Sequence, residues 1–199
     1  MKDFKNWWYY HKGYVIVAAI VAVAAGRSIY IKATAIKPDL TAAIVTDSVI
    51  PAEAAAELED ALRSRCGDYN QDGRVVVRIA AFGDPDADAL GVESAAYKTA
   101  SEAELIGDIS GCDSYLFITD DPVKLQRGYQ ILAMPDGSCP EDNDYSAEGK
   151  TIPLPEAFDG IENEFLSGCS IGRRCFYNEK TCRYLEEYEQ LWDSIRPET

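Results

Sequence analysis

The stretch GDYNQDGRVVVRIAAF at residues 67–82 decides the fold, because it joins the end of one predicted element to the start of the next. Its second half, at 74–82, is rich in β-branched residues and predicts a buried strand. Its first half places Asp68, Asn70 and Asp72 at alternate positions, directly before a glycine. The stretch therefore predicts a polar loop that leads into the interior of a sheet.

Predicted strands and helices alternate along the chain on both sides of this loop. The first predicted helix has a proline in its first turn and a stripe of alanine and leucine on one side. The pattern predicts strands at 41–46, 74–82 and 114–119, with helices at 51–66 and 95–109 between them. Such alternation favours parallel strands joined by right-handed crossovers. The expected fold class is α/β, with a βαβαβ, mostly parallel sheet flanked by helices.

The C-terminal third has weaker signals until its last helix. Residues 128–160 are rich in Gly, Pro, Asp and Glu, which predicts loops around short strands such as 129–133. A final helix is indicated by apolar residues at helical spacing, namely Leu185, Tyr188, Leu191, Trp192 and Ile195. We expect this helix to pack against the sheet.

An uninterrupted apolar run, YVIVAAIVAVAA, fills residues 14–25 near the N-terminus. Aromatic residues precede it, and an apolar continuation after Arg27 extends it to about the length of a membrane-spanning helix. Basic residues ahead of the run place the N-terminus in the cytoplasm. The predicted parts are a cytoplasmic head at 1–13, a transmembrane anchor at 14–31, a tether at 32–40 and an extracytoplasmic domain at 41–199. The alternative is a secreted protein, because the triplet AVA at 22–24 suits signal-peptide cleavage.

Charge and histidine content exclude several classes of function. The chain has 34 acidic and 19 basic residues, a net charge of −15, and such a surface repels nucleic acid. Its one histidine, His11, lies in the predicted head, so the outer domain has none for Ser-His-Asp or Cys-His catalysis or for a histidine zinc site. A phosphate-binding glycine loop and a dinucleotide fingerprint are both absent from the sequence. We predict no catalytic residue, and a carboxylate pair is the mechanism that the composition still permits.

The polar loop has the ligand pattern of a calcium site. Its predicted ligands are the side chains of Asp68, Asn70 and Asp72 and the backbone carbonyl of Arg74. An EF-hand needs an acid at the twelfth position, where this chain has Ile79, so we predict a structural helix-loop-strand site. The missing carboxylate would come from Asp84, Asp86 and Asp88, or from the pair Asp120 and Asp121. The alternative is a polar turn whose side chains satisfy backbone groups.

Six cysteines lie beyond the predicted anchor, and an even number in an oxidising exterior predicts up to three disulfides. They are Cys66, Cys112, Cys139, Cys169, Cys175 and Cys182. We predict a bridge between Cys66 and Cys112, because the helix carrying Cys66 ends at the sheet edge where the strand after Cys112 begins. The other four would cross-link the C-terminal part. A four-cysteine zinc site and buried free thiols are the alternatives.

Several segments of the chain carry a resemblance to a known group. They are the aromatic and basic head, KPDL at 37–40, DYNQDGRV at 68–75, SYLF at 114–117 followed by Asp120 and Asp121, and YLE at 184–186. Together they resemble uncharacterised single-pass proteins of clostridial-type Gram-positive bacteria. The resemblance implies an extracellular domain similar to one lobe of a periplasmic solute-binding protein, with no established activity. The six cysteines and the segment around Cys139 depart from the pattern of that group.

Three functional hypotheses follow from the sequence. The first is a membrane-anchored extracytoplasmic binding module, with a structural calcium ion and a small molecule or an envelope protein as its partner. The second is a carboxylate-dependent hydrolase of cell-wall polysaccharide. The third is a structural subunit whose acidic body meets a basic partner at the membrane surface.

Overall fold

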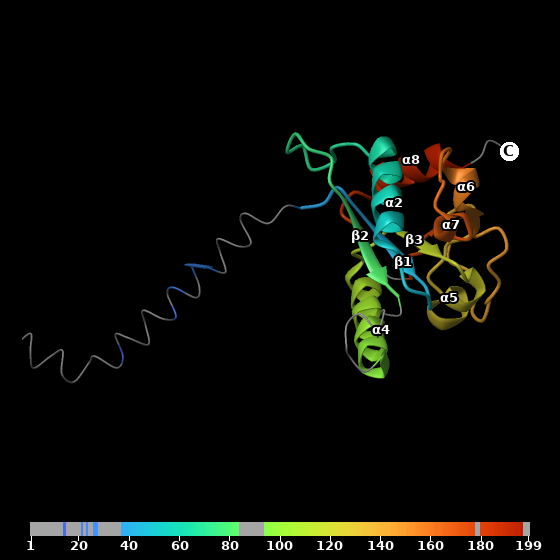
Figure 1. The fold of residues 1–199 in the computed structure, drawn as a ribbon, viewed down its shortest axis with the longest axis horizontal. Coiled ribbons are helices and arrows are strands. Elements are labelled where there is room, and N and C mark those ends of the chain that lie inside the picture. The colour runs from blue at the N-terminus through green and yellow to red at the C-terminus, as the bar shows by residue number, and fades with distance from the viewer. Residues whose placement is uncertain are drawn as a thin grey trace, which may run out of the picture. The chain divides into compact units, whose positions relative to one another are not determined.

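The computed structural model describes residues 37–83, 94–177 and 180–196, together with the isolated positions 14, 21, 23, 26 and 27. The chain divides into two units, Met1–Lys37 and Pro38–Thr199, and the second contains the sheet (Figure 1). The predicted head at 1–13 lies outside the described residues, and so does the predicted anchor at 14–31 apart from those five positions. Within the described ranges, no helix is long and apolar enough to cross a membrane.

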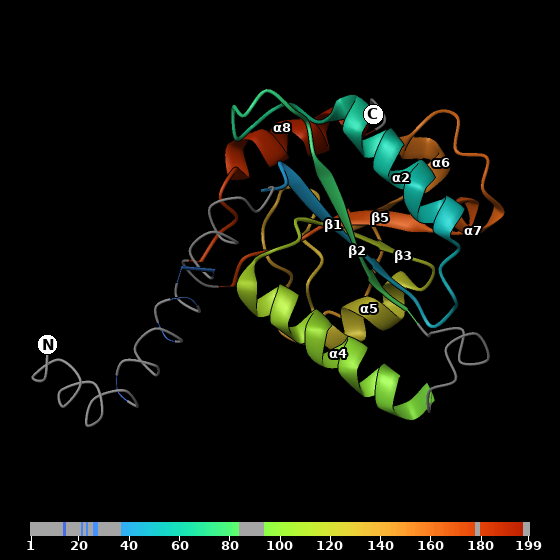
Figure 2. The same ribbon diagram turned by 60° about the vertical axis from the view of Figure 1, so that its left-hand side comes forward.

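The sheet has five strands in the order β2-β1-β3-β5-β4 (Figure 2). The strands are β1 Leu40–Val45, β2 Val77–Phe82, β3 Leu116–Thr119, β4 Thr151–Pro153 and β5 Ser170–Arg173. β1 pairs in parallel with both β2 and β3, whereas β5 runs antiparallel to β3 and to β4. The α/β class and the parallel βαβαβ half are confirmed. The expectation of a mostly parallel sheet is wrong, because β5 pairs antiparallel with both of its neighbours and makes the sheet mixed.

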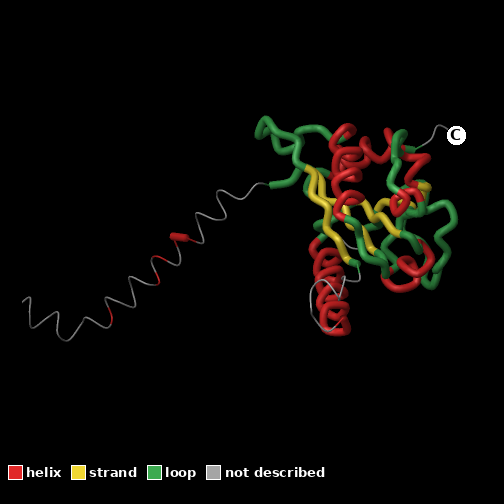
Figure 3. Tube along the Cα trace, viewed as in Figure 1, coloured by secondary structure: helices red, strands yellow, loops and turns green. Residues whose placement is uncertain are grey.

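Helices cover both faces of this sheet, and strands lie between them in Figure 3. The helices are α2 Ala52–Arg65, α4 Ser94–Gly111, α5 Pro122–Tyr129, α6 Leu154–Ala157, α7 Glu164–Ser167 and α8 Leu185–Ile195. Successive residues of a strand point to opposite faces. In β1, Leu40, Ala42 and Ile44 therefore pack with α2 and α8, while Ala43 packs with α4 and α5. The two apolar clusters give the domain three layers.

The first and last helices confirm the sequence patterns. Leu58 and Leu62 of α2 are fully buried, and each such leucine contributes about 2 kcal/mol of hydrophobic stabilisation. In α8, Tyr188, Leu191 and Trp192 are buried in the same cluster as β1. The 3.6-residue period therefore identified the faces that meet the sheet.

α5 and β5, like the short helices α6 and α7, have no counterpart in the sequence predictions. α5 starts directly after Asp121, whose side chain accepts a hydrogen bond of 2.9 Å from the backbone N of Lys124. The Asp-Pro pair was its signal, since aspartate caps helices and proline suits the first turn. β5 is only four residues long and contains a glycine and an arginine, so it lacks a β-branched run. The strand predicted at 129–133 is reduced to an isolated bridge between Leu132 and Arg174.

Candidate functional site

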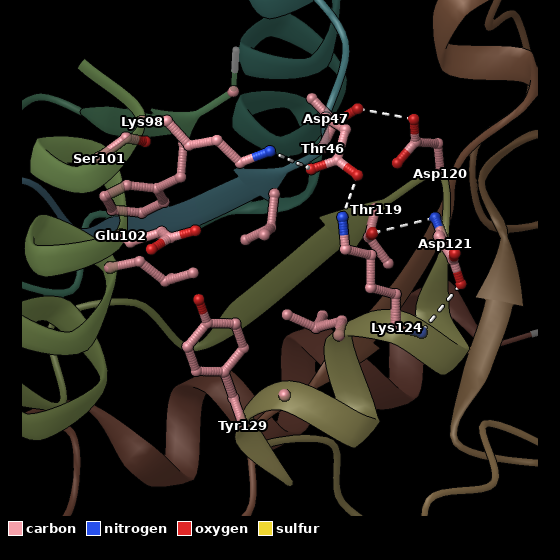
Figure 4. A pocket seen from close by; sticks show the side chains of 16 residues that line it. Thr46, Asp47, Lys98, Ser101, Glu102, Thr119, Asp120, Asp121, Lys124 and Tyr129 are labelled. Carbon is pink, nitrogen blue, oxygen red and sulfur yellow. Dashed lines mark hydrogen bonds and ion pairs between the residues drawn. The ribbon is translucent and has the colours of Figure 1, made fainter. Parts of the chain in front are cut away.

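A cleft of about 510 Å³ opens at the carboxyl ends of the three parallel strands. Its lining includes the residues that follow β1, β2 and β3, together with side chains of α4 and α5 (Figure 4). β2 and β3 lie on opposite sides of β1, and the helices that lead to them cover opposite faces of the sheet. Such a switch point, outside the carboxyl ends of parallel strands, is where open α/β sheets bind ligands.

A hydrogen bond joins the residues that follow β1 and β3, and both of these residues line the cleft. The Thr46 hydroxyl donates to the Asp120 carboxylate at 2.6 Å, across 74 residues of sequence. The same hydroxyl oxygen accepts from the backbone N of Ser48 at 3.0 Å. Thr46 is buried and Asp120 is exposed, so the bond ties a solvent-facing carboxylate to the sheet.

Opposite charges meet across the mouth of the cleft. Asp47 forms ion pairs with Lys124 of α5 and, at 3.7 Å, with Lys98 of α4. The hydrogen bond from Lys124 lowers the pKa of Asp47, and the same bond raises the pKa of Lys124. All three side chains are more than half exposed, so each pair stabilises the fold by less than about 1 kcal/mol. The three charged groups are therefore weakly paired and accessible to solvent at the mouth of the cleft.

The wall between α4 and α5 combines apolar and acidic groups. Phe82, Leu105 and Leu125 give it an apolar surface, and all three are buried. Burial raises the pKa of the neighbouring Tyr129 phenol, with the nearby Glu102 carboxylate adding to the effect. Among the described residues, Glu102 has no ion-pair partner. An apolar wall with a carboxylate and a phenol suits a ligand that has both apolar and polar parts.

The predicted calcium loop lies at the opposite end of the sheet, directly ahead of β2. Asp68 accepts hydrogen bonds from the backbone N of Asp72 at 3.1 Å and of Gly73 at 2.8 Å. Asn70 Oδ1 accepts from the backbone N of Asp72 at 2.9 Å, and Asp72 Oδ1 from that of Arg74 at 3.0 Å. The four predicted ligands thus belong to one turn whose side-chain oxygens already satisfy backbone groups. Calcium binding there remains a prediction.

The acids proposed to complete the calcium site are not gathered beside the loop. Asp120 and Asp121 follow the end of β3, whereas the loop precedes the start of the parallel strand β2. The two segments therefore lie at opposite ends of the parallel strands. Asp120 and Asp121 cannot be the missing ligands. Asp84, Asp86 and Asp88 lie outside the described residues. In the described part of the chain, no three His, Cys, Asp or Glu side chains form a metal-binding group.

A buried aspartate that the sequence patterns missed holds this loop in place. Asp39 is fully buried, and its carboxylate accepts from the backbone N of Asn70 at 2.9 Å and of Val76 at 2.8 Å. The Tyr188 hydroxyl also donates to the Asp39 carbonyl at 2.6 Å. The end of the predicted tether at 32–40 is therefore part of the packed domain. Asp39 joins the loop to β1, and Tyr188 joins this junction to α8.

All six cysteines are unlinked thiols in the structure. The Cys66 Sγ donates to its own neighbour, the Gly67 carbonyl, at 3.5 Å, and burial raises the pKa of this thiol to about 11. The Cys112 Sγ instead donates to the Lys180 carbonyl at 3.4 Å. The bridge between Cys66 and Cys112 remains a prediction.

Comparison with protein-family models, with curated protein sequences and with solved structures finds no match for this chain. The class that the fold and cleft define is an α/β domain with a mixed five-stranded sheet and a cleft at the switch point of its parallel half. The functional argument therefore rests on the position, the charge and the lining of that cleft.

Proposed function

We propose that this protein is a membrane-tethered extracytoplasmic binding module that takes a small ligand in the cleft at the carboxyl ends of β1, β2 and β3. The observation that carries the proposal is the cleft of about 510 Å³ at the switch point of the sheet. Its volume falls within the range of roughly 300–1,000 Å³ that is usual for small-molecule sites. The apolar run at 14–25 and the resemblance to a lobe of solute-binding proteins support the same proposal from the sequence.

The charges of the cleft favour a ligand with a cationic group. Its lining contains four carboxylates, those of Asp47, Glu102, Asp120 and Asp121, against the two lysines Lys98 and Lys124. Both lysines pair with the same carboxylate, Asp47. Because Glu102 forms no ion pair with any described residue, its carboxylate can bind an ammonium or guanidinium group of a ligand whose apolar part lies on Phe82 and Leu125.

A binding measurement on Glu102 tests this proposal. We expect amines with a small apolar group, screened by thermal shift and titrated by calorimetry, to bind the full chain. Glu102→Gln should weaken that binding by about tenfold, because a charge-assisted hydrogen bond contributes about 1.5 kcal/mol or more. Glu104→Gln is the matched control, since Glu104 is an exposed acid of the same helix outside the cleft lining. Equal affinities of the Glu102→Gln variant and the wild type would contradict the assignment.

The hydrolase alternative has less support from the cleft. In the described structure, Asp47 is paired with lysines, Asp120 accepts from Thr46, and Asp121 caps α5. A general acid needs a raised pKa, and among the described residues the carboxyl group whose pKa burial raises is that of Asp108, which lies outside the cleft lining. Asp108 instead accepts from the Ser114 hydroxyl at 2.7 Å. A structural-subunit role remains the third hypothesis.

We also propose calcium as a structural ligand of the loop formed by Asp68, Asn70, Asp72 and the Arg74 carbonyl. With millimolar calcium and a weak extracellular-type site, the free energy of unfolding should rise by about 1 kcal/mol relative to chelator. Thermal melts should show an increase of about 3 °C for a domain of this size. The ion would bind side-chain oxygens that without it only accept hydrogen bonds from backbone N–H groups.

Two variants separate this calcium effect from a general effect of charge. Asp72→Ala should abolish the difference between calcium and chelator. Asp136→Ala should preserve it, because Asp136 is an exposed aspartate in another loop whose carboxylate accepts from the backbone N and the hydroxyl of Ser138. Superimposable wild-type melts in calcium and in chelator would rule the site out.

A further inference from the structure

Cys112 and Cys182 lie side by side although 70 residues separate them in the sequence. The Cys182 Sγ donates to the Cys112 carbonyl at 3.4 Å, and the Cys112 Sγ donates to the carbonyl of Lys180 at 3.4 Å. The Lys180 ammonium group also donates to the Ser110 carbonyl at 2.7 Å. Three contacts thus hold the segment before α8 against the end of α4, with the two thiols between them.

A second pair of thiols comprises Cys139, in the segment after α5, and Cys175, two residues after the end of β5. The Cys175 backbone N donates to the Ile131 carbonyl at 2.7 Å, and the turn after Ile131 folds back so that the Met134 backbone N donates to the carbonyl of Ser138, the residue before Cys139, at 2.9 Å. The Cys175 Sγ also donates to the Gln130 carbonyl at 3.4 Å, and the Tyr177 hydroxyl donates to the same carbonyl at 2.8 Å. These bonds hold the segment after β5 beside the loop that contains Cys139.

The remaining two cysteines cannot pair with each other. Cys66 follows α2, at the end of the sheet where the parallel strand β2 begins. Cys169 precedes β5, and Ser170 is paired with Thr119 at the carboxyl end of β3. β2 and β3 point in the same direction. Cys66, near the start of β2, and Cys169, near the end of β3, therefore lie at opposite ends of the strands. A disulfide requires α-carbons within about 7 Å, which excludes this pairing.

We propose that the protein forms two disulfides, Cys112–Cys182 and Cys139–Cys175, and keeps Cys66 and Cys169 as thiols. The first would bind the C-terminal helix α8 covalently to the end of α4. The second would bind the segment after β5 to the loop that follows α5. This pairing does not depend on what the cleft binds, and it competes directly with the bridge between Cys66 and Cys112.

Each pair has the asymmetry that thiol–disulfide exchange uses. Cys112 and Cys139 are half-buried, whereas Cys182 and Cys175 are buried. With a glutathione-type disulfide as oxidant, the half-buried thiolate attacks one donor sulfur and releases one donor thiol. The buried partner then attacks the mixed disulfide and releases the second donor thiol. Two cysteine S–H bonds and the donor S–S bond are broken, one protein S–S bond forms, and the two protons end on the donor thiols.

The second step should be slow at neutral pH and faster at higher pH. Burial raises the pKa of Cys182 to about 11 and that of Cys175 to about 12. Below these values the thiolate fraction grows about tenfold with each pH unit, so the mixed disulfide should disappear correspondingly faster.

Peptide mapping of the full chain tests the pairing. The protein is incubated with oxidised glutathione, its free thiols are blocked, and the unreduced digest is analysed by mass spectrometry. We expect linked peptides for Cys112–Cys182 and Cys139–Cys175 and a loss of about 2 Da for each disulfide, since two hydrogen atoms leave. Cys66 and Cys169 should be labelled only after denaturation, because both are buried. A link between Cys66 and Cys112, or the recovery of six free thiols, would overturn the proposal.

Serine variants give a second measurement that does not depend on the wild-type map. Cys182→Ser should leave Cys112 open to labelling and preserve the Cys139–Cys175 link. Cys169→Ser is the matched control, a buried cysteine outside both pairs, and should preserve both links. Loss of the Cys112–Cys182 link in the Cys66→Ser variant would count against the assignment.

Discussion

Replacing Asp39 by alanine is expected to lower the free energy of unfolding by about 3 kcal/mol. The Asp39 carboxylate is fully buried and accepts from the backbone N of Asn70 and Val76. Alanine would leave both N–H groups without their acceptor and would free the loop ahead of β2 from β1. Urea denaturation followed by circular dichroism measures the loss.

Two further variants make this prediction specific. Asp39→Asn should cost about half as much, because an amide oxygen can accept one of the two bonds while its NH₂ group faces the other donor. Asp72→Ala removes a carboxylate of the same loop that is exposed, and in the absence of calcium it should cost less than about 1 kcal/mol. A loss below about 1 kcal/mol for Asp39→Ala would show that the loop does not depend on this anchor.

Replacing Arg174 by alanine is expected to lower the free energy of unfolding by about 3 to 4 kcal/mol. Its guanidinium group is buried and donates to the carbonyls of Ser114 at 2.9 Å and Ile109 at 2.8 Å. The group also lies 5.2 Å from the centre of the Phe176 ring. Arg174 thus supplies a cation at the C-terminal end of α4, where the helix dipole favours one. Its removal would take the charged donor from both carbonyls, although the Ile109 carbonyl would still accept from the backbone N of Cys112 at 3.3 Å.

The geometry of the guanidinium group predicts how other substitutions behave. Arg174→Lys keeps the charge but has no planar fork, so it should recover about half of the loss. Arg127→Ala, at an exposed arginine in the last turn of α5, should change stability by less than about 0.5 kcal/mol. Urea midpoints compare the three variants. If Arg174→Ala lowered the free energy of unfolding no more than Arg127→Ala does, the hydrogen bonds of Arg174 would not contribute to stability.

Local patterns in the sequence were sufficient for the parallel half of the fold. Apolar runs identify β1 and β2, and the helical spacing of apolar residues identifies α2 and α8 with their buried faces. Each of these elements is recognised from the spacing of the side chains that face the core. That spacing can be seen within a few neighbouring residues. The antiparallel half carries no such local signal, since Gly172 and Arg173 make up half of β5.

The candidate site was less accessible to sequence reasoning. The sequence shows Asp120 and Asp121 as an acidic pair, and one of the two alternatives for the missing calcium ligand uses them, although the calcium loop lies at the opposite end of the parallel strands. Nothing in the sequence around Lys98 and Glu102 distinguishes them from other charged residues of a helix. Only the parallel pairing of β1 with β3 brings Thr46 to Asp120 and opens the cleft between α4 and α5.

By itself, the sequence determined the α/β class, the acidic character of the chain and the polar turn at Asp68, Asn70 and Asp72. These properties depend on composition and on neighbours a few residues apart. The tertiary structure alone decided the order of the strands, the lining of the cleft and the neighbours of each cysteine. The physical reason is that these contacts join segments about 30 to 70 residues apart, and their geometry is set by how whole helices and strands pack.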